Sequence, residues 1–216
     1  KYTSLSGVMT HAGHSYNTNN PIELRKIANI ERDSVLLASQ NLKNVGQSCS
    51  IISLGSTPTV VYTSNLDGIT EVRCGVYMLW DLAQASKGIC KIDDIAITVL
   101  ASIIGHNYHD NKILVDAGAL AMSKDISANQ FYPNAGYGIV CEANSSKPYK
   151  SLSLSELHQE HGTIKIDHPK LFTDFPIGSL VRILPNHSCL TCAGHQYYNI
   201  LENNAIVDSW SRTNGW

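Results

Sequence analysis

The sequence predicts an α/β segment followed by an antiparallel β domain, with the boundary near residue 80. Up to that point, buried strands alternate with one long amphipathic helix, which is the strand–helix–strand order of parallel sheets. Beyond it, short apolar strands follow one another with little helical pattern between them. We therefore expect residues 1–80 to form the first part and residues 81–216 to form the second.

The first part is predicted to contain two strands that flank a helix. Leu5–Thr10 and Cys49–Leu54 are short apolar runs typical of buried strands. The helix should begin at Pro21 after an Asn20 cap and stop at Gly46. Its buried face is expected to comprise Leu24, Ala28, Glu31, Val35, Ala38 and Leu42, with one polar residue interrupting the stripe. In such an arrangement, ligands gather at the carboxyl ends of the strands.

The second part is predicted to be built from strands joined by turns. The expected strands are residues 92–104, 112–115, 139–142, 180–184, 197–201 and 206–208. The last two are separated by Asn203-Asn204, a pair that favours a tight hairpin turn.

Composition narrows the classes of partner. The chain has 216 residues, of which 43% are hydrophobic and 16% charged, with a net charge of −2. This near-neutral balance predicts neither nucleic-acid nor membrane binding, and no apolar run is long enough for a membrane span. The six cysteines are scattered through a chain too long to need disulfides, and the first residues do not resemble a signal peptide. We expect reduced thiols and a cytoplasmic location.

Two segments of the first part carry polar chemistry. Gly55-Ser-Thr-Pro-Thr59 follows a buried strand and offers backbone N–H groups and hydroxyls suited to a phosphate, although an ordinary Gly-Pro turn would have the same composition. His11-Ala-Gly-His-Ser-Tyr16 also follows a strand and could form the wall of an active site.

The strongest metal-binding pattern lies near the C-terminus. Val181–Thr191 is predicted to be extended, so His187 and Cys189 would point to the same side and could bind one ion. The alternative is a buried apolar cysteine beside a hydrogen-bonded histidine. Cys192 completes a Cys-x-x-Cys, which could also be a redox pair or half a zinc knuckle, but a packed thiol is the preferred interpretation.

Six motifs in order carry a resemblance to a known family. They are His11-Ala-Gly-His-Ser-Tyr16, Gly55-Ser-Thr-Pro-Thr59, Thr70-Glu-Val-Arg-Cys-Gly-Val-Tyr77 with Asp81, Asp116-Ala-Gly118, Gln159-Glu-His-Gly162 and Pro185-Asn-His-Ser-Cys-Leu-Thr191. Together they resemble the D-serine dehydratase and D-threonine aldolase family of pyridoxal-phosphate enzymes, which are built like fungal-type alanine racemases.

The resemblance implies a fold and two ligand sites. Residues 1–80 would be the C-terminal part of a (β/α)8 barrel on the cofactor phosphate side, and residues 81–216 the β domain that carries the metal. The pyridoxal 5'-phosphate contacts would come from Tyr16, Gly55, Ser56, Thr57 and Thr59. The zinc ligands would be His187 and Cys189, with open positions for water and substrate.

The same resemblance implies a reaction. The family's Schiff-base lysine lies near the start of its barrel, and no matching motif occurs here, so no catalytic residue is assigned. The missing barrel half is an expected partner, and the isolated chain is expected to be inactive. In this family a cysteine two residues after the metal histidine resembles the dehydratases, whereas an aspartate resembles the aldolases.

We therefore expect a dehydratase that converts a D-3-hydroxyamino acid such as D-serine into a keto acid and ammonia. A D-threonine aldolase-type lyase and a non-catalytic metal-binding module are the alternatives. Related enzymes form homodimers, which is the assembly that the resemblance implies.

Overall fold

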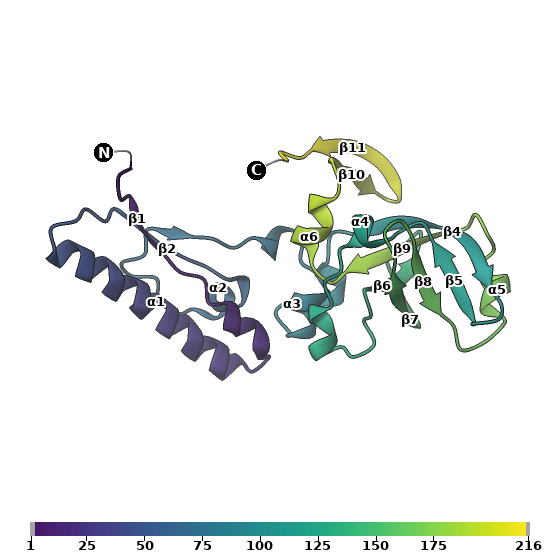
Figure 1. Cartoon of the computed structure of the whole chain (residues 1–216), viewed down its shortest axis with the longest axis horizontal. Helices are drawn as coiled ribbons and strands as arrows, with labels where there is room; N and C mark the ends of the chain where they lie inside the picture. Colours follow the sequence, from purple (N-terminus) through teal and green to yellow (C-terminus); the bar gives the residue numbers. More distant parts are fainter. Residues whose placement is uncertain (1–2, 215–216) are drawn as a thin grey trace. The chain divides into compact units, whose positions relative to one another are not determined.

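The computed structural model describes residues 3–214, whose contacts divide the chain into two compact units (Figure 1). The first unit comprises the residues up to Met78 together with Lys87–Ile89. The second comprises Leu79–Ser86 and the residues from Cys90 onward. Each unit is described by itself below.

The first unit is a small parallel sheet with helices. Its strands β1 (Gly7–Met9), β2 (Ile51–Leu54) and β3 (Glu71–Val72) lie side by side in that order, and both pairings are parallel. Between them run the 3-10 helix η1 (Gly13–Asn17), the long helix α1 (Pro21–Asn44) and the short helix α2 (Thr57–Tyr62), and the 3-10 helix η2 (Val76–Met78) follows β3. The predicted strand–helix–strand order is confirmed.

Local sequence explains both ends of α1. The side-chain oxygen of Asn20 accepts hydrogen bonds from the amides of Ile22 and Glu23, and Pro21 occupies the first helical position, where its missing N–H costs nothing. The chain leaves the helix at Gly46, whose φ of +77° lies in the left-handed region that favours glycine. The predicted boundaries of this helix are confirmed.

The buried face of α1 differs from the prediction in its last turns. Leu24, Ala28, Glu31 and Val35 are buried as expected, but Ala38 is exposed and Ser39 is buried in its place. Spacings of four residues continue past Val35, so the buried stripe drifts by one position relative to the predicted one.

The second unit contains a closed six-stranded barrel. Its strands are β4 (Val99–Asn107), β5 (Lys112–Val115), β6 (Gly138–Glu142), β7 (Pro148–Leu157), β8 (Gly162–Lys165) and β9 (Leu180–Pro185). They close in the order β4-β5-β8-β7-β6-β9, and every neighbouring pair is antiparallel. Closure leaves no unpaired strand edge, which removes a site for non-native pairing.

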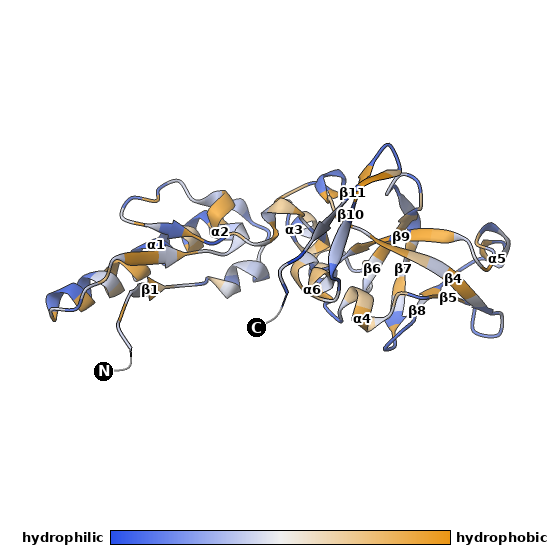
Figure 2. Ribbon diagram, turned by 90° about the horizontal axis from the view of Figure 1, so that it is seen from above, coloured by the Kyte–Doolittle hydropathy of each residue, from blue (hydrophilic) through white to orange (hydrophobic). Residues whose placement is uncertain are grey.

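Alternating side chains fill the barrel interior. In β4 the buried residues Val99, Ala101 and Ile103 alternate with more exposed ones, as expected for a strand with one buried face. They pack with aliphatic side chains from the other strands, among them Ile113, Val115, Val140, Leu154, Ile164, Val181 and Ile183. Figure 2 shows hydrophobic colouring along these strands and hydrophilic colouring in their connecting loops. Complete burial of each such side chain contributes about 1.5–3 kcal/mol.

Short helices cap the two ends of this barrel (Figure 1). Helix α5 (Leu171–Asp174) lies at one end and contributes Phe172 to the core. Helices α3 (Leu82–Ser86), α4 (Ala119–Met122) and α6 (Ser188–Ala193) lie toward the other end, with the 3-10 helix η4 (Ser127–Gln130) packed against α3.

A separate hairpin follows α6. Strands β10 (Tyr197–Glu202) and β11 (Ala205–Ser211) pair antiparallel through a two-residue loop. Asn203 and Asn204 have φ angles of +50° and +66°, the conformation that the Asn-Asn pair predicts.

Several predicted elements of the second unit are wrong. The strand expected over residues 92–104 begins only at Val99, because Ile92–Asp94 form the 3-10 helix η3, in which Asp94 accepts a hydrogen bond from the Lys91 amide. Strands β7 and β8 were not predicted, since the alternation Leu152-Ser-Leu-Ser155 of β7 is short and is broken at Glu156-Leu157, and β8 has only four residues. The short helices were missed as well, because four to six residues show no helical period.

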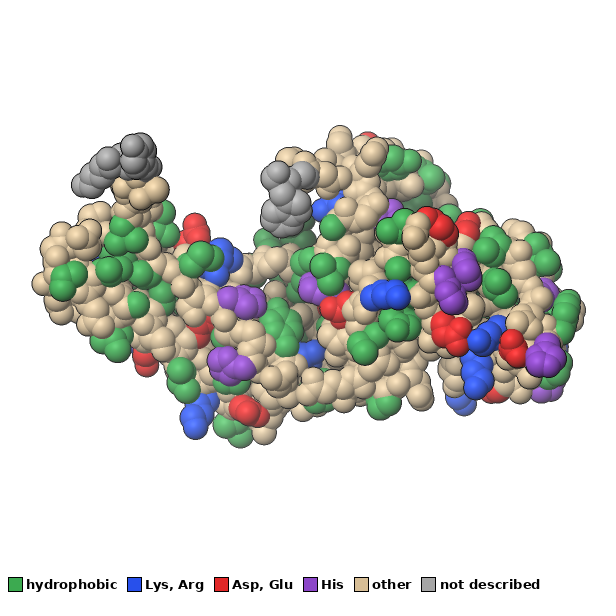
Figure 3. Space-filling model, viewed as in Figure 1, with side chains coloured by type: hydrophobic (Ala, Val, Ile, Leu, Met, Phe, Trp, Pro, Cys, Tyr) green, Lys and Arg blue, Asp and Glu red, His purple; other side chains and the backbone are tan. Residues whose placement is uncertain are grey.

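No helix within residues 3–214 combines the length and the apolar character that crossing a bilayer requires. Figure 3 shows acidic, basic and histidine side chains interspersed on the visible face of the molecule rather than gathered into a field of one sign.

Candidate functional site

In the first unit, the two polar motifs lie against each other. The Nδ1 of His11 donates to the carbonyl oxygen of Gly55 at 2.5 Å, and the hydroxyls of Ser15 and Ser56 are 3.1 Å apart. The first motif follows β1 and the second follows β2, so the carboxyl ends of adjacent parallel strands bring them together. The predicted wall and the predicted phosphate turn therefore form one polar cluster.

Gly55 is required by the close approach of another chain segment. A Cβ at this position would collide with the carbonyl oxygen of Arg73, which lies immediately after β3. The Arg73 guanidinium in turn donates to the carbonyl oxygen of Thr10 at 2.6 Å. Glycine thus allows the turn after β2 to sit against the chain after β3, and three of the six motifs meet in this unit.

The hydroxyls of the phosphate turn are buried and mutually bonded. Ser56, Thr57 and Thr59 are each at most 2% exposed. The hydroxyls of Ser56 and Thr59 lie 2.8 Å apart, and Thr59 also donates to the carboxylate of Glu31. The first amides of α2 have no acceptor within their own helix. Buried hydroxyls beside such amides are chemically suited to a phosphate group.

Tyr16 belongs to the 3-10 helix η1 that follows β1. Its ring stacks on His11 with 6.2 Å between centroids, and the ammonium of Lys87 lies 5.8 Å from the Tyr16 centroid. Lys87 is only 2% exposed, so a buried amino group accompanies the polar cluster. The sequence offered no signal for Lys87, because it belongs to a segment outside the motifs.

In the second unit, His187 and Cys189 lie at the junction between a strand and a helix. The prediction that residues 181–191 are all extended is wrong, because β9 ends at Pro185 and α6 begins at Ser188. His187 is the extended N-cap residue of α6, and Cys189 lies in the first turn of that helix. The two side chains still interact, since a hydrogen bond to Cys189 contributes to the raised pKa of His187.

Asp125 orients the imidazole of His187. Its carboxylate accepts a hydrogen bond from Nδ1 of His187 at 3.1 Å. This bond holds a proton on Nδ1, so Nε2 is the nitrogen that a metal could bind once its own proton is lost, an arrangement common behind metal-binding histidines. Ser127 holds the carboxylate through its amide, 2.7 Å from the second oxygen.

His187 and Asp125 each stabilise the charged form of the other. The Asp125 carboxylate, together with Cys189, raises the pKa of His187 to about 10. In return, hydrogen bonds from His187 and Ser127 hold the pKa of Asp125 well below its usual range. A metal ion would have to displace the proton from this imidazole, which couples metal binding to proton release.

Among the cysteines that the structure describes, Cys189 alone is exposed. Burial raises the pKa of Cys90 and of Cys141 to about 12, and burial also raises that of Cys192. The accessible thiol is therefore the one that lies beside His187. An imidazole nitrogen and a thiol are borderline-soft donors that suit zinc.

Buried polar side chains hold the junction that carries the pair. Asp81, 1% exposed, accepts from the Ser188 amide at 3.0 Å with one oxygen and from the Gln84 amide at 3.0 Å with the other. Asn186, also 1% exposed, accepts from the amide of Ala128 and donates to the carbonyl oxygen of Gly136. The turn that carries His187 and Cys189 is thus tied to α3 and to the loops around η4.

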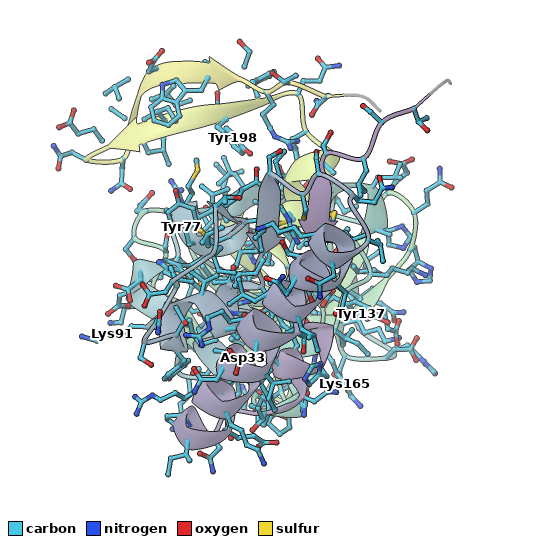
Figure 4. All side chains as sticks on the ribbon, turned by 90° about the vertical axis from the view of Figure 1, so that its left-hand side faces the viewer. Asp33, Tyr77, Lys91, Tyr137, Lys165 and Tyr198 are labelled. Atoms are coloured by element: carbon cyan, nitrogen blue, oxygen red, sulfur yellow. The ribbon has the colours of Figure 1, made fainter. Side chains whose placement is uncertain are left out.

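Cys192 is a packed thiol rather than a second outward-facing ligand. It is 3% exposed and interacts with Tyr198, whose side chain lies near the C-terminal hairpin in Figure 4. The Arg212 side chain donates to the carbonyl oxygen of Cys192 and lies 5.5 Å from the Tyr198 ring centroid. These contacts agree with the preferred interpretation of Cys192.

The remaining two motifs also meet in the second unit. The amide of Ala119 donates to the carbonyl oxygen of His158, and that of Leu120 to Gln159. A Cβ at Gly118 would collide with the backbone at residues 159–161. Glu160 and His161 lie in the turn between β7 and β8. These motifs therefore shape the backbone around α4.

Within residues 3–214, no set of three or more histidine, cysteine, aspartate or glutamate side chains is arranged to hold a metal ion. His187 and Cys189 are therefore a candidate pair of donors without a third such side chain arranged beside them within these residues. Asp125 was missed because it lies 62 residues before its partner along the chain, in a segment without a recognisable pattern.

Replacing Asp125 with alanine should weaken zinc binding by about 10- to 100-fold, because His187 would lose the group that fixes its tautomer and ring orientation. Asp125→Asn keeps an acceptor for Nδ1–H and should lose less. Competition with a chelator of known affinity measures both values. The exposed carboxylate of Asp208 provides a control, and Asp208→Ala should leave zinc affinity unchanged. Equal affinities in Asp125→Ala and the unmodified protein would contradict this role.

The sequence is similar to one family model and to several known dehydratases. A family model described as a putative serine dehydratase domain matches residues 96–201. D-threo-3-hydroxyaspartate dehydratase from Delftia sp. (strain HT23) is 40% identical over 216 residues, which cover 98% of this chain and 57% of that protein. D-serine dehydratase from Dictyostelium discoideum is 32% identical over 225 residues, which cover 100% of this chain and 56% of that protein. The chain thus spans just over half the length of these relatives.

Solved structures agree with the sequence matches. The Delftia enzyme superposes with a TM-score of 0.88 at 39% identity, over 98% of this chain and 57% of that one. Two further structures of that enzyme carry alanine in place of a histidine and in place of a cysteine two residues later, and the cysteine variant is in a metal-free form. An alanine-racemase-like protein from Idiomarina loihiensis superposes with a TM-score of 0.88 at 38% identity, covering 98% and 56%.

A more distant structure shares the fold alone. D-threonine aldolase from Filomicrobium marinum superposes with a TM-score of 0.69 at 17% identity, over 96% of this chain and 53% of that one.

Proposed function

This chain belongs to the D-serine dehydratase family, and from that premise we propose that it is the C-terminal portion of a pyridoxal-phosphate- and zinc-dependent dehydratase. Its substrate class is a D-3-hydroxyamino acid such as D-serine or D-threo-3-hydroxyaspartate, and its products are a keto acid and ammonia. The observation that carries the proposal is the His187–Cys189 pair, oriented by Asp125, in a chain 40% identical to a dehydratase across nearly its whole length.

The donor set supports the metal assignment. His187 offers Nε2 and Cys189 offers an exposed thiol, and the pair has the two-residue spacing of the histidine and cysteine substituted in the Delftia enzyme. Two protein donors leave positions for water and for the substrate hydroxyl, as a catalytic rather than a structural zinc requires.

The cofactor contacts are proposed from the polar cluster of the first unit. Ser56 and Thr57 would hold the phosphate through the backbone amides of this turn and the Thr57 hydroxyl, and Gly55 lets that turn form. Tyr16 completes the proposed set of contacts, and Thr59 lies in the same turn. The first unit would be the C-terminal part of a (β/α)8 barrel, which its parallel strands and long helix support. The Schiff-base lysine is assigned to no residue of this chain.

The roles of the chain's own side chains follow from these contacts. When bound, pyridoxal phosphate supplies an electron sink for loss of the Cα proton, and zinc supplies a Lewis acid for departure of the β-hydroxyl. His187 and Cys189 would hold the metal, and the Asp125 hydrogen bond to Nδ1 would keep Nε2 turned toward it. Asp81 fixes the turn between the two ligands, so the metal position is set by a buried hydrogen-bond network.

Product analysis of the full-length protein tests the proposal. Incubated with D-serine, D-threonine and D-threo-3-hydroxyaspartate in turn, it should release ammonia and the corresponding keto acid in equal amounts. Glycine and an aldehyde without ammonia would instead indicate the aldolase alternative. Zinc binding without turnover of any of these substrates would indicate a non-catalytic metal-binding module. The cytoplasmic location and the homodimer stay predictions.

A further inference from the structure

A buried carboxylate lies behind the proposed phosphate turn. Glu31 is in the middle of α1 and is 5% exposed. One of its oxygens accepts a hydrogen bond from the Ala12 amide at 3.0 Å, and the other accepts from the Thr59 hydroxyl at 2.5 Å. Ala12 belongs to the loop after β1 and Thr59 to the first turn of α2. Glu31 therefore joins the two segments that form the polar cluster.

The carboxylate also determines the direction of the neighbouring hydroxyl hydrogen bonds. The Thr59 hydroxyl donates to Glu31, so its single proton is directed to the carboxyl group. The oxygen of Thr59 must then accept from Ser56, 2.8 Å away, and the oxygen of Ser56 must accept from Ser15, 3.1 Å away. These side chains form a chain of donors that ends at Glu31, and all of them are at least 95% buried.

This direction changes the role of Thr59. Its single hydroxyl proton is used within the protein, so it supports the turn rather than donating to a bound phosphate. The Ala12 amide cannot rotate to another acceptor, and a buried amide left without a partner is unfavourable. Both segments consequently depend on the same carboxylate for their position.

We infer that Glu31 is a positioning residue of the proposed phosphate site, which locks the loop after β1 and the first turn of α2 into the arrangement that receives the cofactor phosphate. The inference rests on the proposed cofactor function. Glu31 touches neither the cofactor nor the substrate in this role. It acts through Ala12 and Thr59, and its effect is specific to the phosphate end of the cofactor.

The simpler possibility is that Glu31 only stabilises the fold. A purely structural role would weaken the binding of any cofactor form to the same extent. Pyridoxal and pyridoxal 5'-phosphate differ only in the phosphate, so the ratio of their dissociation constants isolates the phosphate site from general destabilisation.

The test measures both dissociation constants by absorbance titration of the full-length apoprotein and its variants. The measured quantity is the dissociation constant of pyridoxal divided by that of pyridoxal 5'-phosphate. In Glu31→Ala this ratio should fall about tenfold, because two hydrogen bonds to the carboxyl group are lost. Glu31→Gln should restore most of the ratio, since its oxygen can accept from Ala12 and its amide can donate to Thr59. Ser39→Ala is the matched control, being buried on the same helix, and should leave the ratio unchanged.

Two outcomes would overturn the inference. A Glu31→Ala protein with the unmodified ratio, or one in which both forms bind more weakly by the same factor, would leave Glu31 with a structural role only. If Glu31→Ala does not fold, Thr59→Val removes the same link from the other side and should give the same loss. An unmodified protein that binds both forms equally would instead refute the proposed phosphate site itself.

Discussion

Replacing Cys189 with alanine is expected to abolish zinc binding and to lower kcat for the dehydratase reaction by about 100-fold or more. The proposed site has two protein donors, so removal of the Cys189 thiol leaves only the imidazole of His187. One neutral nitrogen cannot hold zinc at the concentrations at which a two-donor site is filled. Because Cys189 is exposed, its truncation leaves no cavity, and the fold should be retained.

Metal analysis after dialysis, together with thermal unfolding, measures this result. Cys192→Ser is the matched control, because this cysteine lies three residues away on the same helix and is buried. We expect it to lower the free energy of unfolding by about 1 kcal/mol, since a hydroxyl replaces a packed thiol, while zinc content is unchanged. Retained zinc in Cys189→Ala, or lost zinc in a folded Cys192→Ser, would refute the assignment.

The His187–Cys189 pair shows what a spacing pattern can predict. His187 and Cys189 were selected for their chemistry and their separation by two residues, and the structure leaves them in contact. The conformation assumed for that spacing was wrong, since the pair spans a strand end and a helix start instead of one extended strand. The cause lies outside the local sequence: the Ser188 amide is held by Asp81, 107 residues earlier in the chain.

Local signals determined the elements that were predicted well. The Asn20 cap, Pro21 and Gly46 define α1 through contacts within a few residues, and those contacts are visible in the sequence. The strand Lys112–Val115 matches its predicted bounds. By contrast, β7 is recognisable only once its partners β6 and β8 close the barrel, because its own sequence lacks a continuous apolar alternation.

Supporting carboxylates could not be predicted for a related reason. Glu31 was noticed only as a polar residue within an apolar stripe, and its two partners lie 19 and 28 residues away. Asp125 has no motif around it. A buried acid among apolar residues nevertheless indicates a donor in the fold, because an unpaired buried charge is strongly unfavourable. That reasoning predicts that a partner exists without identifying it.

Asp81 is a further buried carboxylate with distant partners, and its one side chain caps two helices. Its oxygens accept separately from the amide at the start of α6 and from an amide in the first turn of α3. Each is a helix N-cap interaction worth about 0.5–2 kcal/mol. One of the capped residues, Ser188, lies between the two metal ligands, so the same hydrogen bond that stabilises α6 also positions His187 and Cys189.

Asp81→Ala should therefore lower the free energy of unfolding by about 3 kcal/mol and weaken zinc binding in the same protein. Asparagine has one acceptor oxygen and can cap only one of the two helices, so Asp81→Asn should lose about half as much stability. Denaturant unfolding and chelator competition measure the two effects.

Asp94→Ala removes an exposed carboxylate that holds a single amide at the start of η3, and should change stability by less than about 0.5 kcal/mol. If Asp81→Asn were as stable as the unmodified protein, the double cap would be refuted; if Asp81→Ala lost stability but kept its zinc affinity, the coupling between the cap and the metal site would be refuted.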